Sequence, residues 1–173
     1  MFDHFSDRSR RIVFFSRGLA GRRGAAAIEV QDLMAALVIE DQAEYGQVWP
    51  ERNDPGVAVS VIPAHRAFLA AETAAVIQRG LEPLLPKAKP LPGSADMPLS
   101  DGAQHLLMAA KEWSEEMRGG SATPSRIEVQ HVEPLHLLAA ALSDETSESA
   151  EVLKQAGVAK EAVIAAIKSG EYS

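Results

Sequence analysis

The stretch IEVQDLMAAL at residues 28–37 has a near-copy, VEPLHLLAAAL at residues 132–142, about a hundred residues further along the chain. Both begin with an apolar residue and a glutamate, and both continue with leucines and alanines at the spacing of one helix face. Each is therefore predicted to be a buried helix whose alanines let another helix approach closely. The repetition indicates that the two halves of the chain share one architecture.

The segments that precede these two helices also correspond to each other. With an offset of 94, FSDRSRRIVFFSRGLA (5–20) aligns with LSDGAQHLLMAAKEWSEEM (99–117), so that Ser6 matches Ser100. A serine followed by an aspartate is typical of a helix start, because the hydroxyl accepts a hydrogen bond from a free backbone N–H group. In the first of these helices we expect Phe5, Ile12, Val13 and Leu19 to form the apolar stripe.

Two helix pairs of this kind each leave an apolar face open, and pseudo-two-fold packing allows each pair to cover the other. The sequence thus predicts an all-α fold, a duplicated helical repeat with about seven or eight helices. We expect one domain over 1–173, with a first repeat at 1–80, a proline-rich linker at 81–98 and a second repeat at 99–170.

Three further segments complete the expected organisation. Residues 44–63 are interpreted as an ordered loop anchored by Trp49, and 64–80 as an alanine-rich helix that ends at Gly80. The segment SAEVLKQAGVAKEAVIAAIKSG (149–170) predicts two short helices separated at Gly157.

Composition excludes several classes of protein. The 173 residues include no cysteine, which rules out disulfide scaffolds, thiolate metal sites and cysteine nucleophiles. The first residues do not resemble a signal peptide, and no apolar run approaches the roughly 20 residues that cross a bilayer. We expect a soluble, cytoplasmic protein that does not bind membranes.

Charge is distributed unevenly along the chain. The net charge is −7, but residues 1–41 contain six arginines and six acidic residues, and the excess of acid lies in the remainder. The arginine cluster at 8–23 is interpreted either as a solvated helix face or as a surface that docks on an acidic partner. Nucleic-acid binding is not expected, because the acidic remainder would repel phosphate.

Motifs for catalysis or metal binding are not found. The five histidines are not arranged as H-E-x-x-H, the sequence has no G-x-S-x-G element, and it has no G-x-x-x-x-G-K-[ST] phosphate loop. We therefore expect no metal site, no cofactor and no enzymatic activity.

Four segments together resemble the N-terminal Clp-repeat domain of Clp-type AAA+ unfoldases such as ClpA and ClpC. They are MFDHFSDRSRRIVFFSRGLA, AIEVQDLMAALV, HVEPLHLLAAAL and SAEVLKQAGVAKEAVIAAI, in the family's order. The resemblance implies a double-repeat helical domain that receives adaptors or substrates. Without a phosphate loop, the chain is expected to be a stand-alone copy of that domain.

The resemblance also indicates where a ligand would bind. Some members of the family carry GTEH at the start of the second helix of each repeat, and its glutamates are associated with phosphoarginine. Here Gln31 and Leu135 occupy the glutamate positions; Gln31 has no charge and Leu135 accepts no hydrogen bond. Phosphoarginine binding in the family's manner is therefore not expected.

The candidate partner-binding residues lie at and near these positions. Two readings stay open for them: a ligand-facing surface, or ordinary first-turn residues; the two phenylalanines are alternatively core residues. The six candidates are Phe2, Phe5, Gln31, Asp32, Leu135 and His136.

The function that these expectations favour is a non-enzymatic protein- or peptide-binding module, an adaptor or regulator of Clp-type proteolysis. Its partner would be a Clp ATPase or protease subunit, an adaptor or a degradation substrate. Two alternatives remain: a small all-α enzyme that uses the 44–63 region, and a structural protein that assembles through its arginine face.

Overall fold

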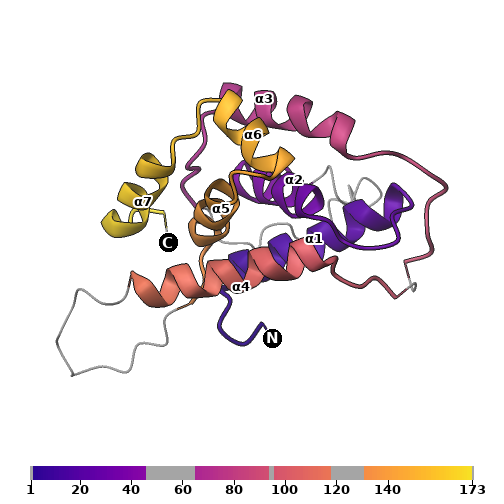
Figure 1. Ribbon diagram of the computed structural model, residues 1–173, viewed down its shortest axis with the longest axis horizontal. Helices are drawn as coiled ribbons and strands as arrows, with labels where there is room; N and C mark the ends of the chain where they lie inside the picture. The colour runs from indigo at the N-terminus through magenta and orange to yellow at the C-terminus, as the bar shows by residue number, and fades with distance from the viewer. Residues whose placement is uncertain (1, 46–64, 94–95, 118–130, 173) are drawn as a thin grey trace, which may run out of the picture.

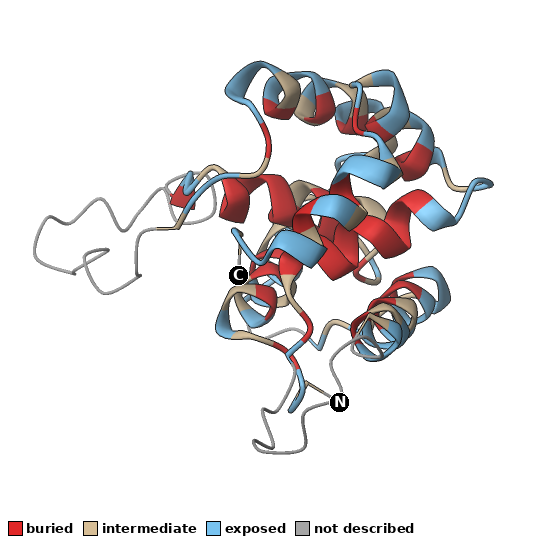
Figure 2. Cartoon of the chain, turned by 90° about the vertical axis from the view of Figure 1, so that its left-hand side faces the viewer, coloured by how far each residue is buried: buried red, intermediate tan, exposed pale blue. Residues whose placement is uncertain are grey.

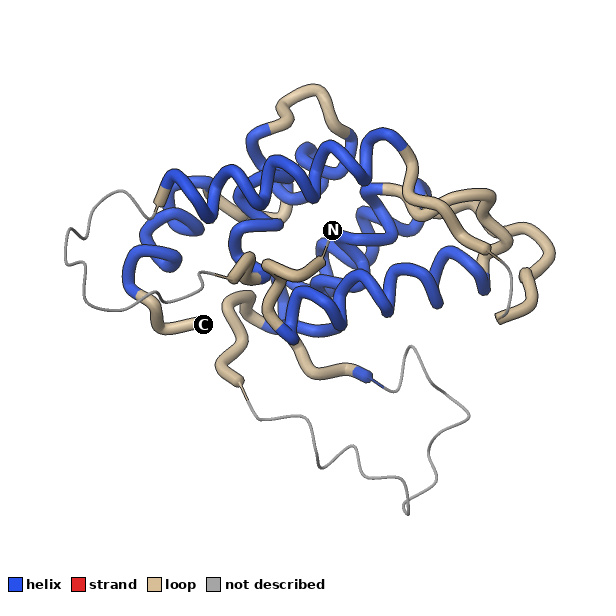
Figure 3. The backbone as a smooth tube through the Cα atoms, turned by 90° about the horizontal axis from the view of Figure 1, so that it is seen from below, coloured by secondary structure: helices blue, strands red, loops and turns tan. Residues whose placement is uncertain are grey.

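The computed structural model describes residues 2–45, 65–93, 96–117 and 131–172, and these ranges contain helices and connecting segments but no strand (Figure 3). The helices are α1 (Asp7–Arg22), α2 (Val30–Asp41), α3 (Ala71–Leu81), α4 (Asp101–Glu116), α5 (Pro134–Ser143), α6 (Glu148–Gln155) and α7 (Lys160–Ser169), with a short 3₁₀ helix, η4 (Glu82–Leu84), after α3. The all-α prediction is confirmed.

The helices form layers around α2 and α5. In Figure 1, α1 and α4 lie along the lower edge, α2 and α5 above them, and α3 and α6 across the top. The pairs α1–α2 and α4–α5 pack against each other as the repeat predicts, and α7 packs against α5. Buried residues concentrate in this middle layer (Figure 2), where almost every residue of α5 is inaccessible to solvent.

Two short parallel bridges join the repeats to each other. Phe5, just before α1, pairs with Val132, just before α5. Ile28, just before α2, pairs with Leu99, just before α4. Under the sequence alignment of the repeats these two bridges correspond, so each repeat contributes one partner to both.

The hydrogen bonds of the two bridges repeat as well. The Val132 N–H donates to the carbonyl of His4 at 2.6 Å, and the Ile28 N–H donates to the carbonyl of Pro98 at 2.8 Å. The Ser6 N–H donates to the Val132 carbonyl at 3.1 Å, and the equivalent bond from Ser100 to Ile28 measures 2.9 Å. The backbone thus confirms the predicted pseudo-two-fold arrangement.

The predicted helix starts are found at α1 and α4. The Ser6 hydroxyl accepts a hydrogen bond from the Ser9 N–H at 3.2 Å, and the Ser100 hydroxyl accepts one from the Ala103 N–H at 3.1 Å. Both serines have the same backbone angles, φ −63° and ψ 162°. The matching Ser-Asp motifs therefore encode the same cap twice.

All four residues of the predicted apolar stripe of α1 lie in the core or pack against it, although not all are fully buried. Phe5 and Ile12 are buried as expected, but Val13 and Leu19 are only half-buried. The buried positions of the helix are Ser9, Ile12, Phe15, Ser16 and Ala20. Serine fits this face because its small side chain leaves room for close helix packing, and the Ser16 hydroxyl donates to the backbone carbonyl three residues earlier.

The predicted start of the third long helix is wrong, because α3 begins at Ala71 rather than at residue 64. The Asp41 carboxylate accepts hydrogen bonds from the N–H groups of Phe68 and Leu69, at 2.8 and 3.1 Å. These N–H groups are thereby bound outside a helix. The predicted loop anchor Trp49 lies outside the described residues.

The proline-rich segment after α3 is attached to the first repeat. Its Ala88 N–H donates to the carbonyl of Arg23 at 2.7 Å, and its Leu91 N–H donates to the carbonyl of Gly21 at 2.9 Å. The segment also includes the η4 turn.

Gly24 lies where the proline-rich segment contacts the first repeat, and we expect this position to tolerate no side chain. It has a φ of +73°, and a Cβ there would clash with the backbone carbonyl of Lys89. Gly24→Ala should lower the free energy of unfolding by about 2 kcal/mol or more, measured by urea denaturation. Gly157→Ala is the matched control: its φ is +87° but a Cβ would meet nothing within 4 Å, so only the backbone cost of about 1 kcal/mol is expected. Equal losses for the two variants would contradict this contact.

Candidate functional site

Asp32 and His136 hold the same position at the start of α2 and of α5. The Asp32 carboxylate accepts a hydrogen bond from the Glu29 N–H, and His136 Nδ1 accepts one from the Glu133 N–H, both at 2.9 Å. In both helices the glutamate side chain accepts from the backbone three residues later, which completes a capping box. Both residues thus have a structural role in starting a helix.

In the first repeat this capping residue belongs to a buried ion pair. Arg23 donates from Nε and Nη2 to the two carboxylate oxygens of Asp32, at 2.8 and 2.7 Å, and the Asp32 side chain is 0 % exposed. The hydrogen bond to Asp32 raises the pKa of Arg23. Both carboxylate oxygens are therefore already engaged within the chain.

In the second repeat, no ion pair joins the same position to a cation among the described residues. The alignment places Met117 where the first repeat has Arg23. His136 is 4 % exposed, its Nε2 has no hydrogen-bond partner among the described residues, and burial lowers its pKa to about 4. The histidine is accordingly neutral near pH 7.

The other predicted site residues divide into buried and accessible ones. Leu135 and Phe5 are buried in the core. Gln31 and Phe2 are half-buried, and the ring of Phe2 packs edge-to-face on Phe5 with centroids 5.4 Å apart. Of the six candidates only Gln31 and Phe2 offer part of their side chain to a partner in this conformation. A ligand role for them stays a prediction.

The arginines of α1 bind a carboxylate that the sequence analysis missed. Glu40 is 0 % exposed, and Arg8 donates to both of its oxygens at 2.9 and 3.0 Å. Arg11 adds a contact of 3.4 Å, and His65 Nδ1 lies 3.8 Å away. A carboxylate near a helix C-terminus is disfavoured by the helix dipole, and the two guanidinium groups offset that cost.

Neither interpretation of the arginine cluster therefore holds for Arg8, Arg11 and Arg23. They are neither a solvated face nor free to dock on an acidic partner, because they bind carboxylates of α2 within the chain. The available signal was the spacing of Asp32 and Glu40, two acids eight residues apart at either end of the apolar run 33–39.

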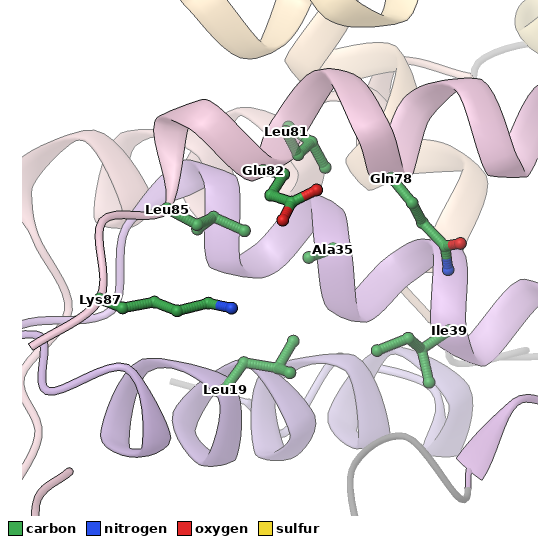
Figure 4. A pocket seen from close by; sticks show the side chains of 8 residues that line it. All are labelled: Leu19, Ala35, Ile39, Gln78, Leu81, Glu82, Leu85 and Lys87. Atoms are coloured by element: carbon green, nitrogen blue, oxygen red, sulfur yellow. The ribbon is translucent and has the colours of Figure 1, made fainter.

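A groove of about 280 Å³ opens between α1, α2 and the α3–η4 segment, and sequence reasoning missed it (Figure 4). Apolar side chains line most of it, and three polar side chains stand among them. The lining residues are Leu19, Ala35, Ile39, Gln78, Leu81, Glu82, Leu85 and Lys87. We call it the α1–α3 groove.

One of the predicted residues shares a helix face with two residues that line the groove. Gln31, Ala35 and Ile39 are spaced four residues apart and so share one face of α2. The corresponding face of α5 carries Leu135 and Ala139, both of which are buried. At these two paired positions, Gln31 and Ala35 are half-buried in the first repeat where Leu135 and Ala139 are buried in the second.

No cluster of three or more metal-binding side chains occurs in the part of the chain that the structure describes. Within the same ranges, no helix has the length and apolarity that a membrane span requires.

Solved structures of other proteins have the same fold as this chain. No family model and no curated protein matches the sequence. Among solved structures, the N-terminal domain of the chaperone ClpD from Arabidopsis thaliana superposes with a TM-score of 0.61 at 22 % identity, with 96 % of each chain covered. The Hsp104 N-terminal domain from Candida albicans has a TM-score of 0.56 at 16 % identity, with 93 % of this chain and 87 % of that one covered.

A structure from work on a malarial protein secretion system is also similar, with a TM-score of 0.66 at 16 % identity over 97 % of this chain and 95 % of the other. The chain therefore has the fold of the N-terminal domains of Clp and Hsp104 proteins. The resemblance predicted from the sequence is confirmed at the level of the fold.

The buried ion pair of the first repeat makes Asp32→Ala strongly destabilising. The change leaves the Arg23 guanidinium without its partner and removes the cap, so the free energy of unfolding should fall by about 3–5 kcal/mol. Glu115→Ala is the control, because Glu115 forms an exposed pair with Lys111 at 3.9 Å and should cost less than about 0.5 kcal/mol. Urea denaturation measures both, and a similar small loss for Asp32→Ala would contradict the pairing.

The buried histidine of the second repeat predicts a specific loss of stability in acid. Its pKa falls from 6.5 to about 4 on folding, so the unfolded chain takes up the proton first and stability is lost as pH falls from 6.5 toward 4. His136→Gln keeps a side chain suited to the capping position but does not titrate.

The difference between wild type and His136→Gln isolates this effect. Wild type should lose roughly 3 kcal/mol more than the variant between pH 7 and pH 4, as measured by urea denaturation at each pH. The raised pKa of Glu133 acts in the opposite direction, but it is common to both proteins. Parallel pH profiles would show that His136 is not buried in the neutral form.

Proposed function

We propose that this chain is a non-enzymatic module that binds peptides or unfolded segments of proteins in the α1–α3 groove. The observation that carries the proposal is the groove itself: a mostly apolar channel between packed helices, with polar groups at a few points of its lining. Peptide sites commonly combine an apolar floor, which provides affinity, with few polar groups, which fix orientation.

The charges at the groove favour a particular kind of ligand. Lys87 and Glu82 both line it, so an apolar peptide side chain in the groove can be flanked by charges of either sign. Gln31 lies on the same face of α2 and offers an amide that can bind a peptide backbone. The net charge of −7 supports a protein partner rather than nucleic acid.

The wider role follows from the similar structures. ClpD is described as a protease-associated chaperone, and the similarity lies in its N-terminal domain. On this basis we assign the chain to the cytoplasm as an adaptor or regulator of Clp-type proteolysis, with a Clp ATPase or protease subunit, an adaptor or a degradation substrate as partner. No metal, cofactor, membrane or phosphoarginine is required.

Binding to the unfolded protein casein tests the groove. Fluorescence anisotropy should detect saturable binding by the wild-type chain, and Leu85→Ser should weaken it by about tenfold, since one buried apolar side chain is worth more than 1 kcal/mol. Val76→Ser is the matched control, because Val76 is an exposed apolar residue of α3 outside the groove. Absence of binding, or equal effects of the two variants, would overturn the groove assignment.

The adaptor role is tested separately in native lysate. The tagged chain should retain Clp subunits, adaptors or Clp substrates, and Leu85→Ser should reduce their recovery while Val76→Ser does not. If none of these proteins is reproducibly retained, the link to Clp proteolysis is wrong even where casein binding holds.

A further inference from the structure

A second set of contacts, away from the α1–α3 groove, holds the segment that follows α7. Three residues make it: Arg8 from α1, and Arg66 and Phe68 from the stretch before α3. We call these three residues the aromatic cradle.

The cradle is fixed by buried groups beneath it. Arg8 is held by its two bonds to the fully buried Glu40. Phe68 is held through its N–H by the Asp41 carboxylate at 2.8 Å, and His65 Nε2 lies 3.1 Å from the Asp41 carbonyl. None of these bonds involves the segment after α7, so Arg8 and Phe68 are held independently of the occupant, whereas Arg66 is an exposed side chain whose printed contacts are with Glu171 and Tyr172.

The occupant is the dipeptide Glu171–Tyr172. Gly170, with a φ of +69°, ends α7 in the left-handed conformation and turns the chain. The Tyr172 ring then meets Phe68 edge-to-face at 5.3 Å, with the Arg66 guanidinium 5.2 Å from its centroid. Arg66 also pairs with the Glu171 carboxylate at 3.1 Å.

The backbone of the occupant is bound as well. Arg8 donates from Nη1 to the Tyr172 carbonyl at 2.7 Å. The cradle therefore contacts three features of the dipeptide: an acidic side chain, an aromatic ring and a backbone carbonyl. Of these, only the carbonyl is common to every sequence, so the other two provide selectivity.

The occupant is held more weakly than the cradle. The side chains of Arg66 and Glu171 are 65 % and 57 % exposed, and ion pairs in such positions contribute little. Tyr172 is half-exposed, and the segment has no further hydrogen bond to the cradle among those described. Such a contact can open without unfolding the core.

We propose that the aromatic cradle is a second peptide-binding site, selective for an acidic residue followed by an aromatic residue, and that Glu171–Tyr172 occupies it in cis. A partner segment of the same chemistry competes with this dipeptide for the cradle. The proposal does not depend on the α1–α3 groove, because the two sites share no residue.

The test adds the peptide acetyl-SGEYS-amide, residues 169–173, to the full isotope-labelled chain and follows amide shifts by NMR. Wild type should show little change, because its own dipeptide fills the site at an effective concentration in the millimolar range. Tyr172→Ala removes the ring from the cradle and weakens the cis segment, so the peptide should displace that segment and shift the signals of Arg8, Arg66 and Phe68 in a saturable manner. Glu171→Lys provides a second way to weaken the cis segment, through an exposed position.

Selectivity is tested in the Tyr172→Ala background. Arg66→Ala should weaken peptide binding by about fivefold. Arg66→Glu should reverse the preference, so that acetyl-SGKYS-amide binds better than acetyl-SGEYS-amide. Because Arg66 is exposed, these variants retain the fold.

Three results would each overturn the proposal. They are equal peptide affinity for wild type and Tyr172→Ala, no saturable binding by either Tyr172→Ala or Glu171→Lys, and binding that Arg66→Glu does not redirect. Shifts confined to the residues of the α1–α3 groove would instead indicate binding there, and would count for the groove and against the cradle.

Discussion

The architecture rests on two crossed backbone bridges. Each joins the residue before the first helix of one repeat to the residue before the second helix of the other, as Phe5 does with Val132 and Ile28 with Leu99. Because both bridges need both repeats, neither helix pair can take its place alone. The crossing brings α2 and α5 into the middle layer, where their apolar faces are removed from water.

The two repeats begin their second helices with the same capping arrangement, but the capping side chain is charged in the first repeat and neutral in the second. Asp32 caps α2 as one half of a buried ion pair, whereas His136 caps α5 as a neutral ring. The same contrast recurs at the other end of the two helices. Glu40 is buried among arginines, while Asp144, its counterpart, is exposed and accepts hydrogen bonds from Thr146. Fixed buried charge is thus concentrated in the first repeat.

The sequence predicted the features that depend on residues close together in the chain. The caps at Ser6 and Ser100 and the paired stretches of α2 and α5 could be read directly, and they were enough for the fold. The start of α3 could not, because it depends on Asp41, which binds N–H groups 27 and 28 residues further along the chain. The groove could not be predicted either, since Leu85 belongs to a proline-rich stretch that reads as a linker. Contacts between distant segments leave no periodic signal.

Duplication makes this division of roles possible. In α5 the face that carries Leu135 and Ala139 is buried and supports the core. In α2 the equivalent positions Gln31 and Ala35 are half-buried, and Ala35 lines the groove together with residues of α3 and η4. One copy can therefore close over the core while the other keeps its surface accessible. The two backbone bridges fix the position of α2 relative to the second repeat. The accessible face of α2 is therefore supported by a rigid scaffold.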